Sequence, residues 1–315
     1  MALENDLLLD RRRIKRRLFV WRGVAVLAVL VAVLVSLSNA QESIGVREHI
    51  ARVTIAGVIA EDRRMTEAIN AVASDDSARA LILVVDSPGG TVAGGESLHA
   101  AIAGVAKRKP VVAVMGGTAA SAGYMISVPA ARIFAREATL TGSIGVKVTI
   151  PEVSGLMDKL GVSAQTLASG PLKDEPSMTR PLTRQGREAM QSLVDDMQDQ
   201  FVQMVAQGRN MPEARVRELA DGRAYTGRQA LKLGLIDAIG GEAEARMWLA
   251  EARDVSQGLG VRDIGRRGFT ERALGEGTWG VMLGEVLGGF GKSLFAQPVG
   301  VDAAWAVWHP GNGGE

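Results

Sequence analysis

Two uninterrupted apolar runs, each followed by a glycine-containing loop, constrain the fold of this 315-residue chain more than any other feature. Residues 81–85 precede a DSPGG loop at 86–90, and residues 111–115 precede a GGTAAS loop at 116–121. Continuous apolar runs of this length are typical of strands buried on both faces of a parallel sheet. A helix predicted over 95–106 separates them, so the pattern predicts an α/β fold with right-handed crossovers.

Hydrophobic periodicity predicts the remaining elements and the domain limits. Further strands are predicted over 51–59, 133–135, 144–150 and 163–167, and further helices over 65–72, 121–128, 151–160 and 190–205. The last helix carries a clean apolar stripe, as expected of a core or subunit interface. We divide the chain into a basic segment 1–17, a transmembrane anchor 18–38, a linker 39–48, a folded domain 49–255 and a glycine-rich tail 256–315 of low order.

The N-terminus has the pattern of a membrane anchor. Residues 11–17 hold six cations, and residues 18–37 form a twenty-residue apolar stretch interrupted only by Arg22. That length is enough to cross a bilayer, and the flanking cations predict that the residues after 37 are exported. A cleaved signal peptide ending at Ser38-Asn39-Ala40 is the main alternative, and a basic nucleic-acid arm is the least favoured one.

Composition excludes several classes of function. Residues 1–22 hold seven Lys/Arg and three Asp/Glu, so the other residues hold 36 − 7 = 29 against 35 − 3 = 32, a net charge of −3. A nucleic-acid-binding domain would instead carry the positive charge itself, so no nucleic-acid partner is expected. The chain has no cysteine and three scattered histidines, which excludes disulfides and thiolate sites and leaves no metal-ligand pattern. We expect no metal and no cofactor.

Ser121 is the candidate nucleophile, because it stands where a strand gives way to a predicted helix. Gly116 and Gly117 are expected to turn the backbone after the strand, and the helix N-terminus would favour developing negative charge. The backbone amides of Gly90 and Ala122 are candidate oxyanion donors. The alternatives are an ordinary helix N-cap at Ser121 and an ordinary turn at Gly90. The pattern is not G-x-S-x-G, so an α/β-hydrolase elbow is not supported.

The general base must come from a residue other than histidine. His99 falls within a predicted helix, His49 lies near the linker and His309 in the tail. Lys173, in the sequence SGPLKD, is the candidate, although desolvation would have to lower its pKa for it to act near neutral pH. An isolated lysine is usually exposed, and Lys147 is a nearer competitor. The parts are those of an acyl-transfer site without histidine.

As a set, these motifs resemble the short form of signal peptide peptidase A, a family of membrane-anchored Ser-Lys serine proteases of bacteria. The matching segments occur in family order within about residues 50–245: 86–90, 120–124, 141–146, 173–174, 221–227 and 234–237. The resemblance implies a ClpP/crotonase-like fold of repeated ββα units, with Ser121 as nucleophile and Lys173 as base. It also implies Ser143 as a hydroxyl that orients the lysine. Members of this family often have an aromatic residue just before the lysine, whereas this chain has Leu172.

The resemblance further implies a homo-oligomeric ring in which Lys173 of one subunit completes the site of the next. Ser121 and Lys173 should then lie beyond hydrogen-bond reach within one subunit. The expected function is an endopeptidase that degrades released signal peptides and other hydrophobic peptides at the exported face of the membrane. The alternatives are a sibling Ser-Lys protease with a specific protein substrate and a non-catalytic, crotonase-like scaffold.

Overall fold

The computed structural model describes residues 21–23, 25–31 and 48–265. Residues 21–23 and 25–31 are helical, and in the described ranges no helix has both the length and the apolarity needed to cross a bilayer. The predicted basic segment, about half of the predicted anchor and nearly all of the predicted linker lie outside the described residues, as does the tail beyond residue 265. The folded unit, from Glu48 onward, is described by itself below.

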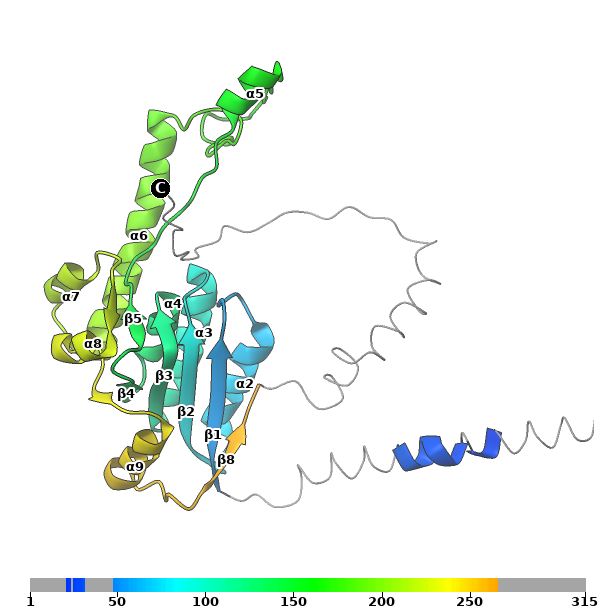
Figure 1. Cartoon of the computed structure of the whole chain (residues 1–315), viewed down its shortest axis with the longest axis vertical. Helices are drawn as coiled ribbons and strands as arrows, with labels where there is room; N and C mark the ends of the chain where they lie inside the picture. The colour runs from blue at the N-terminus through cyan, green and yellow to red at the C-terminus, as the bar shows by residue number, and fades with distance from the viewer. Residues whose placement is uncertain (1–20, 24, 32–47, 266–315) are drawn as a thin grey trace, which may run out of the picture. The chain divides into compact units, whose positions relative to one another are not determined.

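The folded unit is built on one sheet, which has eight strands within residues 48–265 (Figure 1). The strands are β1 (His49–Ala56), β2 (Ala78–Ser87), β3 (Val111–Ala120), β4 (Arg132–Ala135), β5 (Leu140–Gly142), β6 (Ala224–Thr226), β7 (Ala238–Ile239) and β8 (Gly260–Asp263). The order is β6-β5-β3-β2-β1-β8, with β4 pairing with β3 and β7. Every pair is parallel except β5 with β6, which confirms the predicted α/β fold with a mostly parallel sheet.

Helices cover both faces of this sheet, as the apolar runs predict. They are α2 (Arg63–Ser74), α3 (Val92–Ala106), α4 (Ala122–Ser127), α5 (Ser154–Leu160), α6 (Arg184–Arg209), α7 (Glu213–Leu219), α8 (Gly227–Leu233) and α9 (Glu242–Arg253). Along β2, Leu81 and Leu83 join a large core that includes residues of α2, α3, α4 and α6. Ile82 points to the opposite face and joins a smaller core with Leu249 of α9. Alternate residues of one strand therefore fill two different cores.

Strand β3 continues through the glycines that were expected to end it. Its register against β2 runs from Val85↔Met115 to Ser87↔Ala119, so β3 carries two extra residues there. The Asp86 side chain occupies this bulge, and its Oδ1 accepts a hydrogen bond from the Thr118 amide at 3.0 Å. A Cβ on Gly116 would lie 3.0 Å from the Asp86 Cγ, which explains why glycine is needed. The prediction of a tight turn at Gly116 and Gly117 was therefore wrong.

Three further differences concern the edges of the fold. The predicted strands 144–150 and 163–167 are not strands, since no neighbouring strand pairs with them, whereas residues 140–142 form β5. Residues 260–263, predicted to belong to the tail, form β8 and pair with β1. Glycine-rich sequence without periodicity gave no signal for this strand, so the sheet extends past residue 255, where we placed the end of the folded domain.

Residues 146–183, which we call the arm, join the sheet to α6. The arm contains α5, and Figure 1 shows α5 at the far end of a projection beyond the sheet. The long helix predicted over 190–205 is confirmed and runs further in both directions. It begins at Thr183, whose side chain caps it by accepting from the Gly186 amide. Helix α6 thus connects the arm to the body of the domain.

Candidate active site

Ser121 has an unusual backbone conformation between β3 and α4. Its φ is +53° and its ψ −120°, a region that residues other than glycine seldom occupy. Two hydrogen bonds hold it: its amide donates to the Gly142 carbonyl at 2.9 Å, and its carbonyl accepts from the Met125 amide at 2.9 Å. Strain of this kind costs about 1–3 kcal/mol, persists only where the surroundings impose it, and is frequent in catalytic residues.

Gly89, in the loop that follows β2, lies beside this serine. Gly89 has a φ of +122°, and a Cβ built on it would lie 2.9 Å from the Cβ of Ser121. The Ile59 amide donates to the Gly89 carbonyl and the Thr91 amide donates to the Ile59 carbonyl, both at 2.8 Å. In this parallel pairing the Gly90 amide faces away from Ile59, and it has no acceptor within residues 48–265.

The second candidate oxyanion donor is the amide of Ala122. Ala122 is the first residue of α4, and the first amides of a helix have no acceptor within the helix. The amides of Gly90 and Ala122 are therefore both available to a ligand oxygen. Their roles as oxyanion donors remain a prediction.

A cavity of about 370 Å³ opens in front of Ser121. Its lining comes from the DSPGG loop, the segment after β5, the middle of α6 and the segment before β6: Pro88, Ser121, Ser143, Gly145, Val146, Lys147, Val194, Asp195, Gln198, Ala220, Asp221 and Gly222. Ser143 also has a left-handed φ of +49°, and its Oγ donates to the Gly222 carbonyl at 3.1 Å. The cavity thus brings Ser121, Ser143 and Lys147 together.

Lys173 lies outside this cavity in a single subunit. It is exposed, it does not line the cavity, and within the described residues no hydrogen bond joins it to Ser121. Its amide donates to the Gly170 carbonyl at 3.1 Å, which closes a short turn of residues 170–174 that we call the lysine turn. This separation is what the hypothesis of a site shared between subunits predicts for one subunit alone.

No histidine among the described residues lines the cavity. His99 lies on α3, where burial lowers its pKa and so disfavours the charged form. His49 starts β1, with its Nε2 at 3.8 Å from a carboxylate oxygen of Asp75. His309 lies outside the described residues. The described histidines therefore give no alternative base for Ser121.

The sequence pattern did not reveal the polar wall that α6 and the segment before β6 contribute to the cavity. Asp195 and Gln198 follow Val194, which we assigned only to an apolar stripe. Gln198 donates from Nε2 to the Ala220 carbonyl at 3.1 Å, while its buried Oε1 has no partner among the described residues. The pKa of Asp221 is lowered by hydrogen bonds from Arg223. The available signal was the pair Asp195 and Gln198, two polar residues three positions apart beside the apolar stripe of α6.

Comparison with known proteins gives consistent matches. Two family profiles match the chain: peptidase family S49 over residues 103–256 and Clp protease over residues 49–145. The "Putative protease slr0021" of Synechocystis sp. is 40% identical over 206 residues, which cover 65% of this chain and 74% of that protein. The "Putative signal peptide peptidase SppA" of Enterococcus faecium is 41% identical over 175 residues, covering 55% of this chain and 51% of that protein.

Among solved structures, the chain is similar to ClpP1 from Listeria monocytogenes, with 17% sequence identity and a TM-score of 0.38. The match covers 60% of this chain and 91% of that one.

Proposed function

Since this chain belongs to peptidase family S49 and is a serine protease, we propose that it is a membrane-anchored endopeptidase with a Ser121–Lys173 dyad. Its substrates are signal peptides released into the membrane and other hydrophobic peptides. This choice is supported by the relative described as a putative signal peptide peptidase and by the apolar segment at residues 18–37. That segment would hold the enzyme at the exported face of the inner membrane, where such peptides are released.

The strained backbone of Ser121, packed against Gly89, is the observation that carries the proposal. The Oγ of Ser121 attacks the scissile carbonyl while its proton passes to the amine of Lys173. The amides of Gly90 and Ala122 stabilise the oxyanion, and loss of one such donor costs about 3–4 kcal/mol. Lys173 returns the proton to the leaving amine, and water then hydrolyses the acyl-enzyme.

Lys173 would act on the serine of a neighbouring subunit in a homo-oligomeric ring of ClpP/crotonase-like subunits. The arm supports this arrangement, because it projects from the domain and carries exposed apolar side chains that a neighbour would cover. They are Val148, Val153, Leu156, Leu160, Val162, Leu167, Leu172 and Met178. Ser143 would hydrogen-bond the incoming lysine. Lys147, which already lines the cavity, is the competing base within one subunit.

Co-assembly of two inactive chains tests the shared site. Ser121→Ala and Lys173→Ala chains, differently tagged and mixed in equal amounts, should regain roughly a quarter of wild-type activity. In a ring of identical contacts, random mixing pairs an intact serine with an intact lysine at about one interface in four. No recovery in confirmed mixed assemblies would contradict the shared site.

Two further measurements test the alternatives to the proposal: Lys147 as the base, and a scaffold without catalytic activity. An active Lys173→Ala enzyme together with an inactive Lys147→Ala enzyme would make Lys147 the base. Covalent labelling of Ser121 by a serine-reactive phosphonate is expected, and its absence in folded protein would favour a scaffold.

A further inference from the structure

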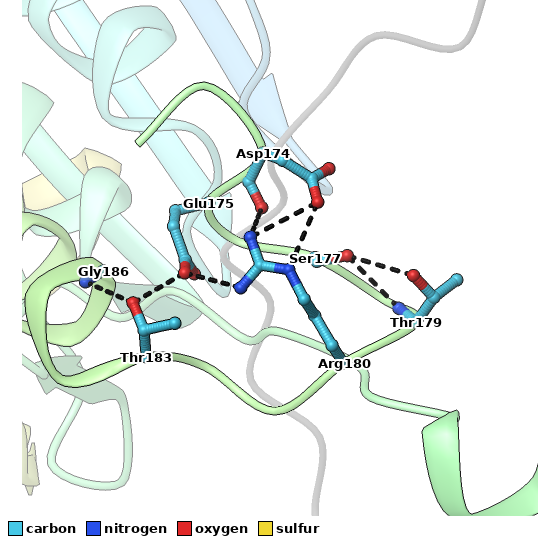
Figure 2. Close-up of polar contacts among 7 residues, drawn as sticks. All are labelled: Asp174, Glu175, Ser177, Thr179, Arg180, Thr183 and Gly186. Carbon is cyan, nitrogen blue, oxygen red and sulfur yellow. Dashed lines mark hydrogen bonds and ion pairs between the residues drawn. The ribbon is translucent and has the colours of Figure 1, made fainter. Parts of the chain in front are cut away.

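A cluster of polar residues directly after Lys173 ties the lysine turn to α6, and Arg180 is at its centre (Figure 2). Its Nη2 donates to the backbone carbonyl of Asp174 at 2.8 Å, and its Nε lies 3.3 Å from the Asp174 carboxylate. Its Nη1 donates to the Glu175 carboxylate at 2.8 Å. One planar guanidinium therefore binds the side chains of both residues that follow Lys173, and also the backbone carbonyl of the first of them, Asp174.

Glu175 continues the cluster into the first turn of α6. Its side chain is only 2% exposed, and its Oε1 accepts a hydrogen bond from the Thr183 hydroxyl at 2.6 Å as well as one from Arg180. The Thr183 hydroxyl also caps α6 by accepting from the Gly186 amide at 3.0 Å. A Cβ on Gly186 would collide with the Glu175 carboxyl group. The carboxylate thus fits against the helix only because residue 186 is glycine.

Electrostatics keeps this carboxylate charged. The hydrogen bond from Thr183, followed by that from Arg180, lowers the pKa of Glu175 below its ordinary value. Burying a charge is unfavourable unless it is paired and hydrogen-bonded. Exposed ion pairs usually contribute little to stability, and Arg184 with Glu188 nearby is one of that ordinary kind. Most of the arm is exposed, whereas the Glu175 side chain is nearly buried. Its ion pair is therefore unlike the exposed surface pairs that contribute little.

We infer that Arg180 and Glu175 form a clamp that positions Lys173 by fixing the lysine turn to the N-terminal end of α6. The inference rests on the proposed dyad. Further along, the same helix contributes Val194, Asp195 and Gln198 to the wall of the Ser121 cavity. The clamp thus fixes the position of Lys173 relative to α6, the helix that forms part of the cavity wall. A base works only when its nitrogen lies within about 2.6–3.2 Å of the oxygen that carries the proton, and a misplacement of about 1 Å can cost about 100-fold in rate.

The clamp can be tested in the full-length assembled enzyme with two variants, Arg180→Gln and Arg180→Lys. Arg184→Gln is the control. Arg180→Gln should lower kcat about 10- to 100-fold with KM changed less than about twofold, because the base is displaced while peptide binding is kept. Arg180→Lys keeps the charge but not the planar fork, so it should recover part of the loss. Arg184→Gln, whose native side chain is 92% exposed, should match wild type.

Gly186→Ala tests the same clamp by a change in α6 instead of in the arm. Alanine favours a helix over glycine by about 1 kcal/mol, so α6 itself would gain, yet its methyl group would displace the Glu175 carboxylate. We expect a lower kcat in a chain that still folds and assembles, as measured by light scattering and thermal unfolding. Gly104→Ala is the matched control, because a Cβ at Gly104 of α3 meets no atom within 4 Å.

The outcomes separate the clamp from the dyad. If Lys173→Ala is inactive while Arg180→Gln and Gly186→Ala keep wild-type kcat per assembled subunit, the clamp is wrong and the dyad stands. A lower melting temperature with unchanged kcat would make the cluster merely structural and would also overturn the inference. If Lys173→Ala stays active, the dyad itself fails. If Arg180→Gln does not assemble, Arg180→Lys and Gly186→Ala decide, because a lower kcat in both supports the clamp.

Discussion

Gly89 and Ser121 lie against each other across the carboxyl ends of β2 and β3, so closely that a Cβ on Gly89 would come within 2.9 Å of the serine Cβ. The same added atom would lie 3.3 Å from the serine Oγ. The loop that contains Gly89 and Gly90 therefore packs directly against the turn that holds Ser121, the proposed nucleophile. Any side chain at residue 89 must move one of them.

Gly89→Ala should consequently lower kcat/KM by about 100-fold, because the added methyl group displaces Ser121. The φ of +122° adds strain for any L-residue. Gly57→Ala is the control: Gly57 also has a positive φ, of +75°, but a Cβ there meets nothing within 4 Å. We expect Gly57→Ala to destabilise the fold by about 1 kcal/mol without loss of activity. Equal kcat/KM in the two variants would contradict this role for Gly89.

Ser121→Ala and Lys173→Ala should each abolish peptide hydrolysis while the fold is kept. If the two residues act together as the proposed dyad, the double variant should be little worse than either single one. His99→Ala should remain active, because His99 does not line the cavity. Hydrolysis of a fluorogenic hydrophobic peptide measures all four variants, and an inactive but folded His99→Ala enzyme would call for a different base.

Asp237 and Asp199 form ion pairs that should differ widely in their contribution to stability. Asp237 accepts from Arg209 at 2.6 and 3.0 Å and from the Ile133 amide at 2.7 Å, and the Arg209 side chain is only 8% exposed. Asp237→Ala leaves this cation unpaired and should cost about 3 kcal/mol in the free energy of unfolding.

Asp199 pairs with Arg217, and both side chains are about half exposed. Asp199→Ala should cost less than about 1 kcal/mol. Urea denaturation measures both variants, and equal losses would contradict the difference in burial.

Glu175 should make the stability of the arm depend on acid. The pKa of its carboxyl group is lowered from 4.5 in the folded state by Thr183 and then Arg180. The stabilisation is therefore complete above pH 4.5 and is lost as the pH falls through the folded pKa. The difference in melting temperature between wild type and Glu175→Gln should shrink from pH 7 to about pH 3. Glu188→Gln, at an exposed ion pair, is the control, and a constant Glu175→Gln difference would contradict the prediction.

The proposed topology has a separate test. Six cations precede the apolar stretch 18–37, so residues after it should be exported. A reporter active only outside the cytoplasm, fused after residue 60, should work. A silent reporter together with an active cytoplasmic one at the same position would reverse the orientation.

The sequence predicted the interior of the fold better than its edges. Residues 81–85 and 111–115 were recognisable because a strand covered on both faces must be apolar throughout. Residues 144–150 and 163–167 were also predicted as strands, but they lie in or next to the arm and pair with no strand among the described residues. Periodicity shows which face of a segment is apolar but not what covers that face. It therefore cannot separate a paired strand from an exposed segment that has no partner strand.

The candidate site was predictable only in part for a related reason. The glycine-rich sequence around Ser121 marked the serine, although the strand bulge filled by Asp86 depends on a contact between β2 and β3. Whether Lys147 or Lys173 approaches Ser121 is a matter of tertiary and quaternary geometry. Lys147 lines the cavity and Lys173 does not, a difference that no local pattern around either lysine encodes.

The length of α6 has a consequence for how such an enzyme is kept under control. Between Gly186 and Gln198 the helix rises about 18 Å, so the lysine turn is held well away from the cavity wall of its own chain. If each subunit lends its lysine to one neighbour and borrows from the other, a newly made chain has no complete site. An open row of subunits always leaves one terminal serine without a base. Such a protease would stay inert until it meets another copy, as a zymogen does, without a propeptide to remove.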